Sequence, residues 1–265
     1  MPKYMRHVLL LAISAGAWLT GLAAAATLPA PPTTATEVVR DTLHGMVLED
    51  PYRWLEDQKS SNTRAWIDTE NRYTDQVMKT VPGYDRIHDR LEKILRVESM
   101  TVPRVRGELY FYTRRKVDQD QASICMRQGL NGPEMVVVDP HPMSPDHAVS
   151  VGIADIDDDG QILAYSIRKG GEDEIELAFR DLEAGKDLQD RLPRARYFGI
   201  SIEPSGRGLY YTRQTASGPR VMHHSFGADP ANDRVVFGER YGPEMIVVSS
   251  LSPDGRWLLV TVNRG

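Results

Sequence analysis

The first residues with the types and spacing to do chemistry form an acidic run. Residues 155–160 read Asp-Ile-Asp-Asp-Asp-Gly and match the first half of a calcium-binding EF-hand loop. Calcium in such a loop also needs a bidentate carboxylate further along, at the position that Ser166 occupies here. Residues 162–167 moreover resemble a strand and not the exiting helix of that motif. We therefore interpret the run as an acidic turn and predict no calcium site.

The histidines and glycines give no pattern for a metal or a cofactor. None of the seven histidines lies in an H-E-x-x-H motif or a Cys/His ladder. The adjacent His223 and His224 would point to opposite faces of a strand, which is poor geometry for shared ligation. Glycine-rich phosphate loops of the two common types are also absent from the sequence. We predict no metal site and no cofactor.

Nucleophilic catalysis has no candidate that meets its requirements. The G-x-S-x-G turn of α/β-hydrolases is absent, and the nearest string, Gly199-Ile-Ser201-Ile-Glu203, lacks the second glycine. The single cysteine, Cys125, lies in a strand-like run, where a structural thiol is the usual interpretation. The sequence therefore predicts no catalytic residue.

The elements that would position such groups form an internal repeat. A glycine is followed by a polar residue, then apolar residues, then Tyr or Val and finally Thr or Ser. The four copies begin at Gly107, Gly160, Gly206 and Gly255. Further strand-like runs lie between the copies, at residues 135–138, 175–179 and 245–248. A turn and a strand that is apolar on both faces, recurring about every 50 residues, are typical of a propeller blade. Unrelated hairpins in a sandwich are the alternative.

The ring that this repeat would build is incomplete. Propellers close with four to eight blades, whereas residues 101–265 hold three blades and the opening of a fourth. The fold class predicted is mainly β, a partial β-propeller preceded by a short α-helical segment. An open ring leaves apolar blade faces in water, which soluble proteins avoid. We expect the sequence to be the N-terminal part of a longer protein, and a fragmentary gene product is the alternative.

Residues 37–100 are expected to form the helical segment. The Ser60-Ser61-Asn62 cluster can cap a helix, along which Trp66 and Tyr73 fall on one face until Pro82-Gly83 ends it. Asp85 can cap a second helix, with apolar residues at helical spacing through Leu95. Two amphipathic helices of this size bury little between themselves, so we expect them to pack against another part of the whole molecule.

The N-terminus is typical of a targeting sequence. Residues 1–26 combine a positive start, a short apolar run and an Ala-rich end, which together indicate a secretory signal peptide. A retained single-span anchor is the alternative. Residues 27–36 are rich in Pro and Thr and are interpreted as a flexible leader. The mature protein is expected to be exported, to the periplasm in a bacterium, and not to be membrane-bound after cleavage.

The composition excludes several other classes. The sequence has 41% hydrophobic and 26% charged residues, which rules out collagen, wholesale disorder and a polytopic membrane protein. Its net charge of −5 gives no general basic footprint for nucleic acid. A single cysteine cannot form an internal disulfide.

Several of these features together resemble the prolyl oligopeptidase family, the post-proline serine peptidases with an N-terminal propeller. The resemblance covers residues 37–265 and is carried by the Asp-Pro-Tyr-Arg-Trp-Leu-Glu-Asp string at 50–57, by Asp139-Pro140 and by the blade starts at 205–211 and 251–256. It implies that residues 37–100 pack on an α/β-hydrolase domain and that residues 101–265 are about three to four blades of a seven-bladed propeller.

The same resemblance bears on function. It implies hydrolysis of short peptides after proline, with the propeller restricting entry to an active site whose Ser, Asp and His lie in a C-terminal hydrolase domain. No catalytic residue is carried over, so the chain alone is expected to be inactive. Asp173 and Tyr197 fall where the family borders its substrate chamber, while Gly152 stands where an arginine is common. A non-catalytic periplasmic propeller that acts as a binding module is the alternative.

Overall fold

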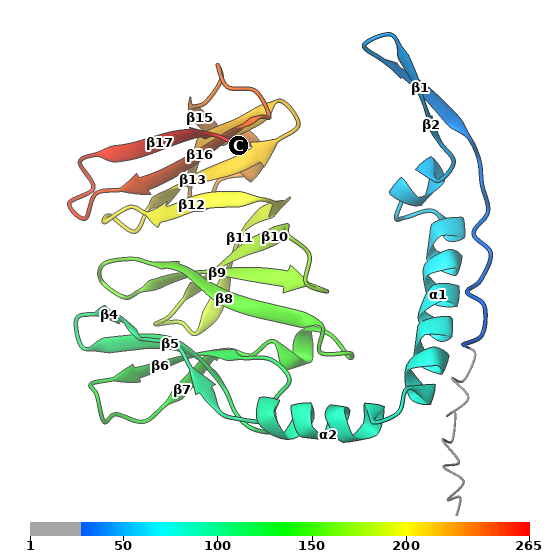
Figure 1. The fold of residues 1–265 in the computed structure, drawn as a ribbon. Coiled ribbons are helices and arrows are strands. Elements are labelled where there is room, and N and C mark those ends of the chain that lie inside the picture. The colour runs from blue at the N-terminus through cyan, green and yellow to red at the C-terminus, as the bar shows by residue number, and fades with distance from the viewer. Residues whose placement is uncertain (1–27) are drawn as a thin grey trace, which may run out of the picture. The chain divides into compact units, whose positions relative to one another are not determined.

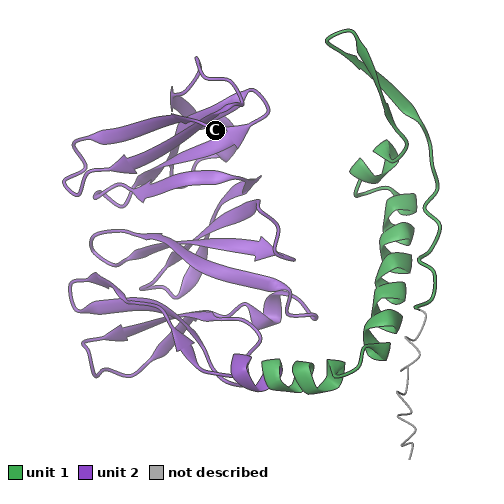
Figure 2. Cartoon of the chain, in the orientation of Figure 1, with its two compact units in different colours: residues 1–91 green, residues 92–265 purple. Residues whose placement is uncertain are grey.

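A computed structural model describes residues 28–265, so the predicted signal peptide lies outside the described residues. The chain divides into two compact units, which meet between residues 91 and 92 and are coloured separately in Figure 2. No helix in the described part of the chain is both long enough and apolar enough to cross a membrane.

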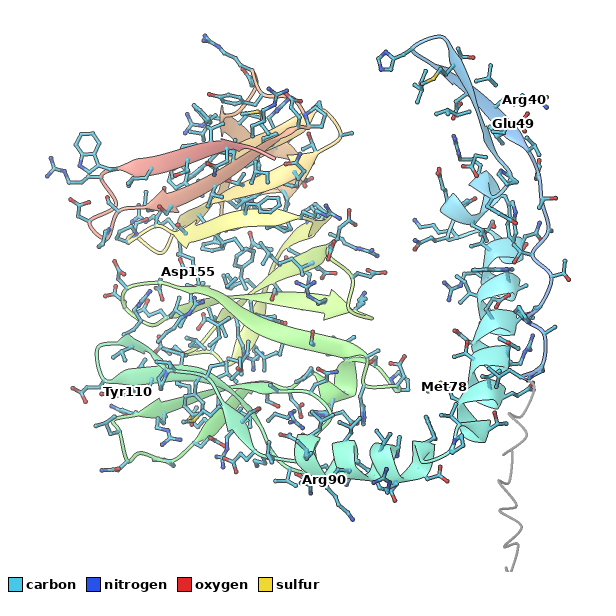
Figure 3. All side chains as sticks on the ribbon, in the orientation of Figure 1. Arg40, Glu49, Met78, Arg90, Tyr110 and Asp155 are labelled. Carbon is cyan, nitrogen blue, oxygen red and sulfur yellow. The ribbon has the colours of Figure 1, made fainter. Side chains whose placement is uncertain are left out.

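The first unit begins with a β-hairpin, although residues 37–100 were expected to be helical. Strands β1 (Val39–Leu43) and β2 (Met46–Asp50) pair antiparallel, and Arg40 and Glu49 face each other across them with 2.8 Å between Nε and Oε1 (Figure 3). Both turn residues, His44 and Gly45, have positive φ, as the two-residue turns that suit strand twist require. The 3₁₀ helix η1 (Arg53–Glu56) follows.

Two helices follow where the capping signals predict them. Helix α1 spans Ser61–Thr80, and the Ser60 Oγ accepts the Thr63 N–H at 3.1 Å as an N-cap. Helix α2 spans Tyr84–Leu95, with Asp85 in its first turn and not at its cap. Residues 28–36 run beside α1 (Figure 1), where the Trp66 indole N–H donates to Thr34 Oγ1 at 3.0 Å and the Tyr73 hydroxyl to the Pro29 carbonyl at 2.8 Å.

The second unit consists of four successive antiparallel sheets, called here the first to fourth blades (Figure 1). The first blade contains β3 (Ser99–Met100), β4 (Arg104–Arg106), β5 (Leu109–Arg115), β6 (Ser123–Gln128) and β7 (Met135–Val138). The second contains β8 (Val149–Ile156), β9 (Ile162–Lys169), β10 (Ile175–Asp181) and β11 (Lys186–Ala195). The third contains β12 (Tyr197–Ile202), β13 (Gly208–Thr215), β14 (Gly218–Ser225) and β15 (Arg234–Phe237). The fourth contains β16 (Met245–Leu251) and β17 (Leu258–Arg264). Two further 3₁₀ turns are η2 (His141–Met143) and η3 (Pro230–Asn232).

These sheets confirm the prediction of three blades and the opening of a fourth. The four repeat glycines lie in the turns directly before β5, β9, β13 and β17 and have φ between 55° and 68°. A side chain disfavours that region of φ, which explains why the repeat places glycine there.

The core lies between blades, which explains strands that are apolar on both faces. Along β9, Leu163 and Tyr165 belong to the cluster shared with the first blade, whereas Ala164 belongs to the cluster shared with the third. Along β10 the order is reversed, with Phe179 facing the third blade and Ala178 the first. Each such fully buried large side chain contributes about 1.5–3 kcal/mol relative to exposure.

Successive blades are also joined by hydrogen bonds at equivalent places on the strand before each repeat glycine, which is β4, β8, β12 or β16 and is termed the first strand of its blade. The Arg106 guanidinium donates to the Ile156 carbonyl at 3.0 Å. The Ile202 N–H donates to Asp155 Oδ2 at 2.8 Å, and the Leu251 N–H donates to Ser201 Oγ at 3.1 Å. Each blade is therefore joined to the next through its own first strand.

The repeated tyrosine has one role in all three complete blades. Each of the three tyrosines is at most 1% exposed, and its hydroxyl donates to a carboxylate at 2.7–2.8 Å. The pairs are Tyr112 with Glu134, Tyr165 with Asp187, and Tyr211 with Asp233. Burial raises the pKa of each of these tyrosines. The fourth copy has Val260 and needs no such partner.

Candidate functional site

Asp173 forms an ion pair with Arg196, the residue directly before Tyr197. Asp173 lies in the turn between β9 and β10, and its Oδ2 accepts a hydrogen bond from Arg196 Nη2 at 3.0 Å. Both side chains are more than half exposed, so the ion pair itself contributes about 0–1 kcal/mol. Arg196 directly precedes Tyr197, the first residue of β12.

The Tyr197 side chain makes more contacts within the fold than the exposed Asp173 side chain does. Its ring packs 5.7 Å from that of Tyr211, centroid to centroid, and its hydroxyl donates to the Pro193 carbonyl. Burial raises the pKa of the Tyr197 hydroxyl, so it acts as a hydrogen-bond donor and not as a base. Asp173, Arg196 and Tyr197 thus offer a carboxylate, a guanidinium and an aromatic surface. Such groups can form ion pairs, hydrogen bonds and aromatic contacts with a ligand.

Sequence reasoning missed Arg196, although the signal was present. An arginine adjacent to Tyr197, together with an acidic turn at 172–174, indicates an ion pair once both segments are placed on neighbouring blades. Gly152, where the family often carries arginine, lies in β8 opposite Ser166. A Cβ at Gly152 would lie 3.1 Å from Ser166 Oγ, so this position closely fits a glycine.

The side chains considered for nucleophilic catalysis serve the structure. Ser201 Oγ accepts the Leu251 N–H at the junction of the third and fourth blades. Cys125 is buried, and burial raises the pKa of its thiol to about 11, which disfavours the reactive thiolate. Neither residue has the activated environment that a nucleophile needs.

The acidic run at 155–160 forms a turn, as interpreted from its sequence. Asp157 Oδ1 accepts the Gln161 and Ile162 N–H groups at 2.7 and 2.8 Å. Asp155, labelled in Figure 3, accepts the Ile202 N–H instead. Burial raises the pKa of both carboxyls. Because backbone groups of different elements use these oxygens, the run does not assemble a ligand set.

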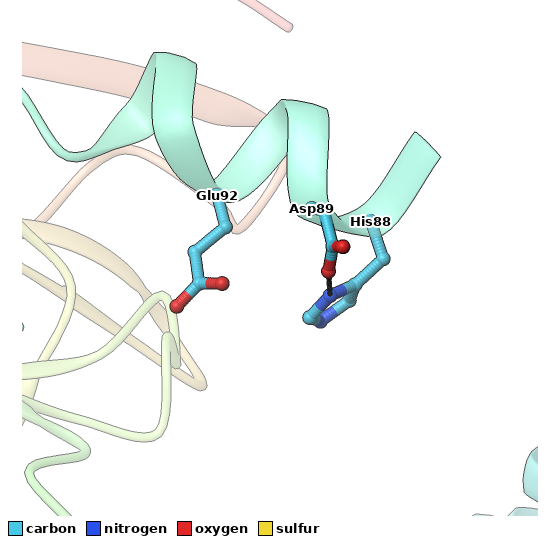
Figure 4. Close-up of side chains that lie close together, drawn as sticks. All are labelled: His88, Asp89 and Glu92. Carbon is cyan, nitrogen blue, oxygen red and sulfur yellow. Dashed lines mark ion pairs between the residues drawn. The ribbon is translucent and has the colours of Figure 1, made fainter. Parts of the chain in front are cut away.

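A different cluster, on α2, has the spacing of metal ligands. His88, Asp89 and Glu92 each offer a ligand atom within 4.8 Å of the others, and His88 Nδ1 lies 3.7 Å from Asp89 Oδ1 (Figure 4). All three side chains are exposed, and Glu92 also pairs with Arg96. Exposed acidic groups of this kind commonly hold no ion, so no metal is assigned to them.

Comparisons with known proteins agree with the fold. The family model for the prolyl oligopeptidase N-terminal β-propeller domain matches residues 31–265. The prolyl endopeptidase of Elizabethkingia meningoseptica is 27% identical over 232 residues, which are 83% of this chain and 33% of that protein. The dipeptidyl aminopeptidase BI of Pseudoxanthomonas mexicana is 28% identical over 244 residues, again 83% and 33%.

Solved structures give the same result. A structure from a structural and mechanistic analysis of two prolyl endopeptidases matches with a TM-score of 0.79 and 30% identity, over 88% of this chain and 36% of that one. Prolyl oligopeptidase B of Galerina marginata, with a TM-score of 0.68 and 17% identity over 88% and 37% of the two chains, shows the shared fold alone. The chain spans about one third of the length of the relatives that it matches.

Proposed function

The chain belongs to the prolyl oligopeptidase family, and on that premise we propose that it is the N-terminal part of an exported serine endopeptidase. The full protein would cleave short peptides after proline. The observation that carries this proposal is the match of the propeller model to residues 31–265, combined with relatives named prolyl endopeptidase of which the chain spans a third. A C-terminal α/β-hydrolase domain would supply the Ser, Asp and His of the triad.

In this proposal the blades bind and admit substrate and do no bond-breaking. Ser201 and Cys125 have structural roles, so neither of them supplies the nucleophile. Asp173 and Tyr197 would border the substrate chamber, where Arg196 adds a positive charge for a peptide carboxylate or carbonyl. The proposal requires no cofactor, because an acyl-enzyme triad hydrolyses peptides without one.

The domain boundaries and the location belong to the same proposal. Residues 37–100 would pack on the hydrolase domain, which is supported by the exposed apolar residues of α2, such as Leu91 and Leu95 at 51% and 64% exposure. Residues 101–265 would form the incomplete propeller and residues 27–36 a leader. Export to the periplasm rests on the sequence of residues 1–26, and N-terminal sequencing of the mature protein tests it. A start at Thr27 is expected, and a retained Met1 would contradict it.

The activity is tested with chromogenic peptides that differ only at the cleaved bond. The full-length protein is expected to cleave an N-terminally blocked substrate with proline before the bond at least tenfold faster than its alanine counterpart. A serine-directed phosphonate should abolish this turnover. An unblocked dipeptide substrate controls for the dipeptidyl aminopeptidase activity that one relative's name indicates. The 265-residue chain alone should show no turnover, because the triad acts as a unit.

Two outcomes would contradict the proposal. A full-length protein that binds proline-containing peptides without turnover would be a binding module. Turnover by the 265-residue chain, blocked by the phosphonate, would mean that a nucleophile lies among these residues.

A further inference from the structure

Each complete blade contains a basic residue, arginine or histidine, beside its tyrosine and carboxylate. This basic residue always lies on the strand that follows the tyrosine's strand, opposite the residue two positions before the tyrosine. The three sets are Tyr112, Glu134 and Arg127 in the first blade; Tyr165, Asp187 and Arg180 in the second; and Tyr211, Asp233 and His224 in the third. The third blade therefore has histidine where the first two have arginine.

The two arginines stay within their own blades. Arg127 donates to the Tyr112 hydroxyl at 2.6 Å, and Arg180 Nη1 lies 3.0 Å from Asp187 Oδ1. Their side chains are 27% and 26% exposed, so water reaches both groups. Their contacts strengthen a blade internally and leave the junction with the next blade to apolar packing and the hydrogen bonds described above.

His224 instead joins two blades and has no exposure. Its Nδ1 lies 2.7 Å from Asp233 Oδ1 in its own blade, and its Nε2 lies 3.1 Å from Asp190 Oδ1 on β11 of the second blade. The side chains of His224, Asp233 and Asp190 are 0%, 2% and 8% exposed. A buried imidazole thus lies between two buried carboxylates from different blades.

Few other groups lie near the His224 ring to balance the charges of Asp190 and Asp233. The Tyr211 hydroxyl donates to Asp233 Oδ2 at 2.7 Å, and the Gly227 N–H donates to Asp190 Oδ1 at 2.6 Å. The Phe179 ring is stacked with the imidazole, with 6.4 Å between the ring centroids, and the Phe226 ring lies edge-on to it, with 6.0 Å between the centroids. Among residues 28–265, Asp190, Asp233 and Tyr211 are the titratable groups hydrogen-bonded within this cluster, and Tyr197 and Arg213 lie further out, beside Tyr211.

The protonation state follows from counting donors. A neutral imidazole has one N–H and one acceptor nitrogen, so one of the two carboxylates would face a lone pair. An imidazolium donates from both nitrogens, satisfies both carboxylates and reduces the buried charge from −2 to −1. We propose that Asp190, His224 and Asp233 form a proton-dependent clasp, in which the imidazolium of His224 holds the third blade to the second.

The clasp gives one junction a pH sensitivity that the arginine sets lack. Histidine is the side chain that exchanges its proton near physiological pH, whereas arginine stays charged. Alkaline conditions remove the proton from the clasp and leave two buried carboxylates facing one N–H. The stability that the clasp provides is therefore present at acidic pH and lost as pH rises through the deprotonation of His224. This inference holds whether or not the protein is a peptidase.

The protonation state is measured directly in the wild-type chain, with ¹⁵N in its histidine rings. At neutral pH the His224 ring should give two protonated nitrogens, both bound to hydrogen bond acceptors. Asp190→Asn identifies the signals, because in residues 28–265 the hydrogen bonds of the Asp190 side chain go to His224 and to the Gly227 N–H, and to no other histidine. A neutral ring with one protonated and one bare nitrogen at neutral pH would overturn the proposal.

Thermal unfolding tests the consequence for the junction. At about pH 6, His224→Gln is expected to lower the melting temperature by about 10 °C, because it leaves buried carboxylates without their cation. This difference should shrink as pH rises, over the same interval in which the ring signals of the wild type change. The matched control is Arg180→Gln, whose effect should be about 2 °C and independent of pH, since its partner Asp187 also pairs with Arg191 at 3.1 Å.

A difference for His224→Gln that stays constant to about pH 9 would contradict the clasp. If His224→Gln does not fold, the wild type is compared with Asp190→Asn in the same titration. Asp190→Asn leaves His224 in place and keeps the size of the side chain at position 190, but removes one carboxylate charge. The melting temperature of this variant should therefore depend on pH less than that of the wild type. Equal pH dependence of the two proteins would again overturn the proposal.

Discussion

Leucines in the second blade and in helix α2 differ strongly in their exposure to solvent. Leu163 in β9 is fully buried between two blades, whereas Leu91 in α2 is 51% exposed although it lies on a regular apolar face. In the blade, the preceding repeat of the same chain covers the leucine. An apolar pattern therefore predicts that one face of an element is buried in the whole molecule. A sequence repeat predicts in addition which part of the chain packs on that face.

Removal of the blade leucine should have the largest effect. Leu163→Ala leaves a cavity between the first and second blades, because the neighbouring side chains are packed from both sheets. The free energy of unfolding should fall by about 2–5 kcal/mol, measured by urea unfolding monitored by circular dichroism. A loss below about 1 kcal/mol would mean that the blades can close the cavity, and the contrast with α2 would weaken.

Removal of one hydroxyl in the same blade should have an intermediate effect. Tyr165→Phe keeps the packing of the ring and deletes the hydrogen bond to Asp187, which retains Arg180 and Arg191 as partners. The expected loss is about 0.5–1.5 kcal/mol in the same urea experiment. A loss as large as that of Leu163→Ala would show that the buried polar pair, and not the apolar packing, dominates this blade.

The matched change on the helix should have the smallest effect. Leu91→Ala removes the same atoms as Leu163→Ala from an exposed position, and alanine favours the helix slightly. The unfolding free energy of the 265-residue chain should change by about 0.5 kcal/mol or less. In the full-length protein the same substitution should cost more if the hydrolase domain covers this face. An equal, near-zero effect in both proteins would contradict that part of the proposed function.

The blades could be predicted from sequence because their signal is repeated and local. The turn glycines and the residues at fixed distances after them mark the start of each blade, and the structure confirms all four. The hairpin at Val39–Asp50 was missed because it is short and occurs once. Its His44-Gly45 turn is the available signal, and histidine is less diagnostic there than the asparagine or aspartate of common hairpin turns.

The site could be predicted only in part. Asp173 and Tyr197 came from resemblance, and their role as substrate-chamber residues stays a prediction. The pairing of each repeated tyrosine with a carboxylate was missed although the sequence carries its signal, because the acidic residue lies 22 positions after the tyrosine in all three blades. The contact of His224 with Asp190 joins residues 34 positions apart in different sheets. Such contacts depend on how sheets pack, which periodicity alone does not encode.

The hydrogen bonds between first strands have an evolutionary consequence. Arg106, Asp155 and Ser201 each reach no further than the adjacent blade, by chemically different bonds at equivalent places. Duplication or deletion of a blade would therefore disturb only the junctions on its two sides, and every other junction would keep its own hydrogen bond. In such an architecture the number of blades can change by whole repeats during evolution. The contacts at each remaining junction can meanwhile diverge independently.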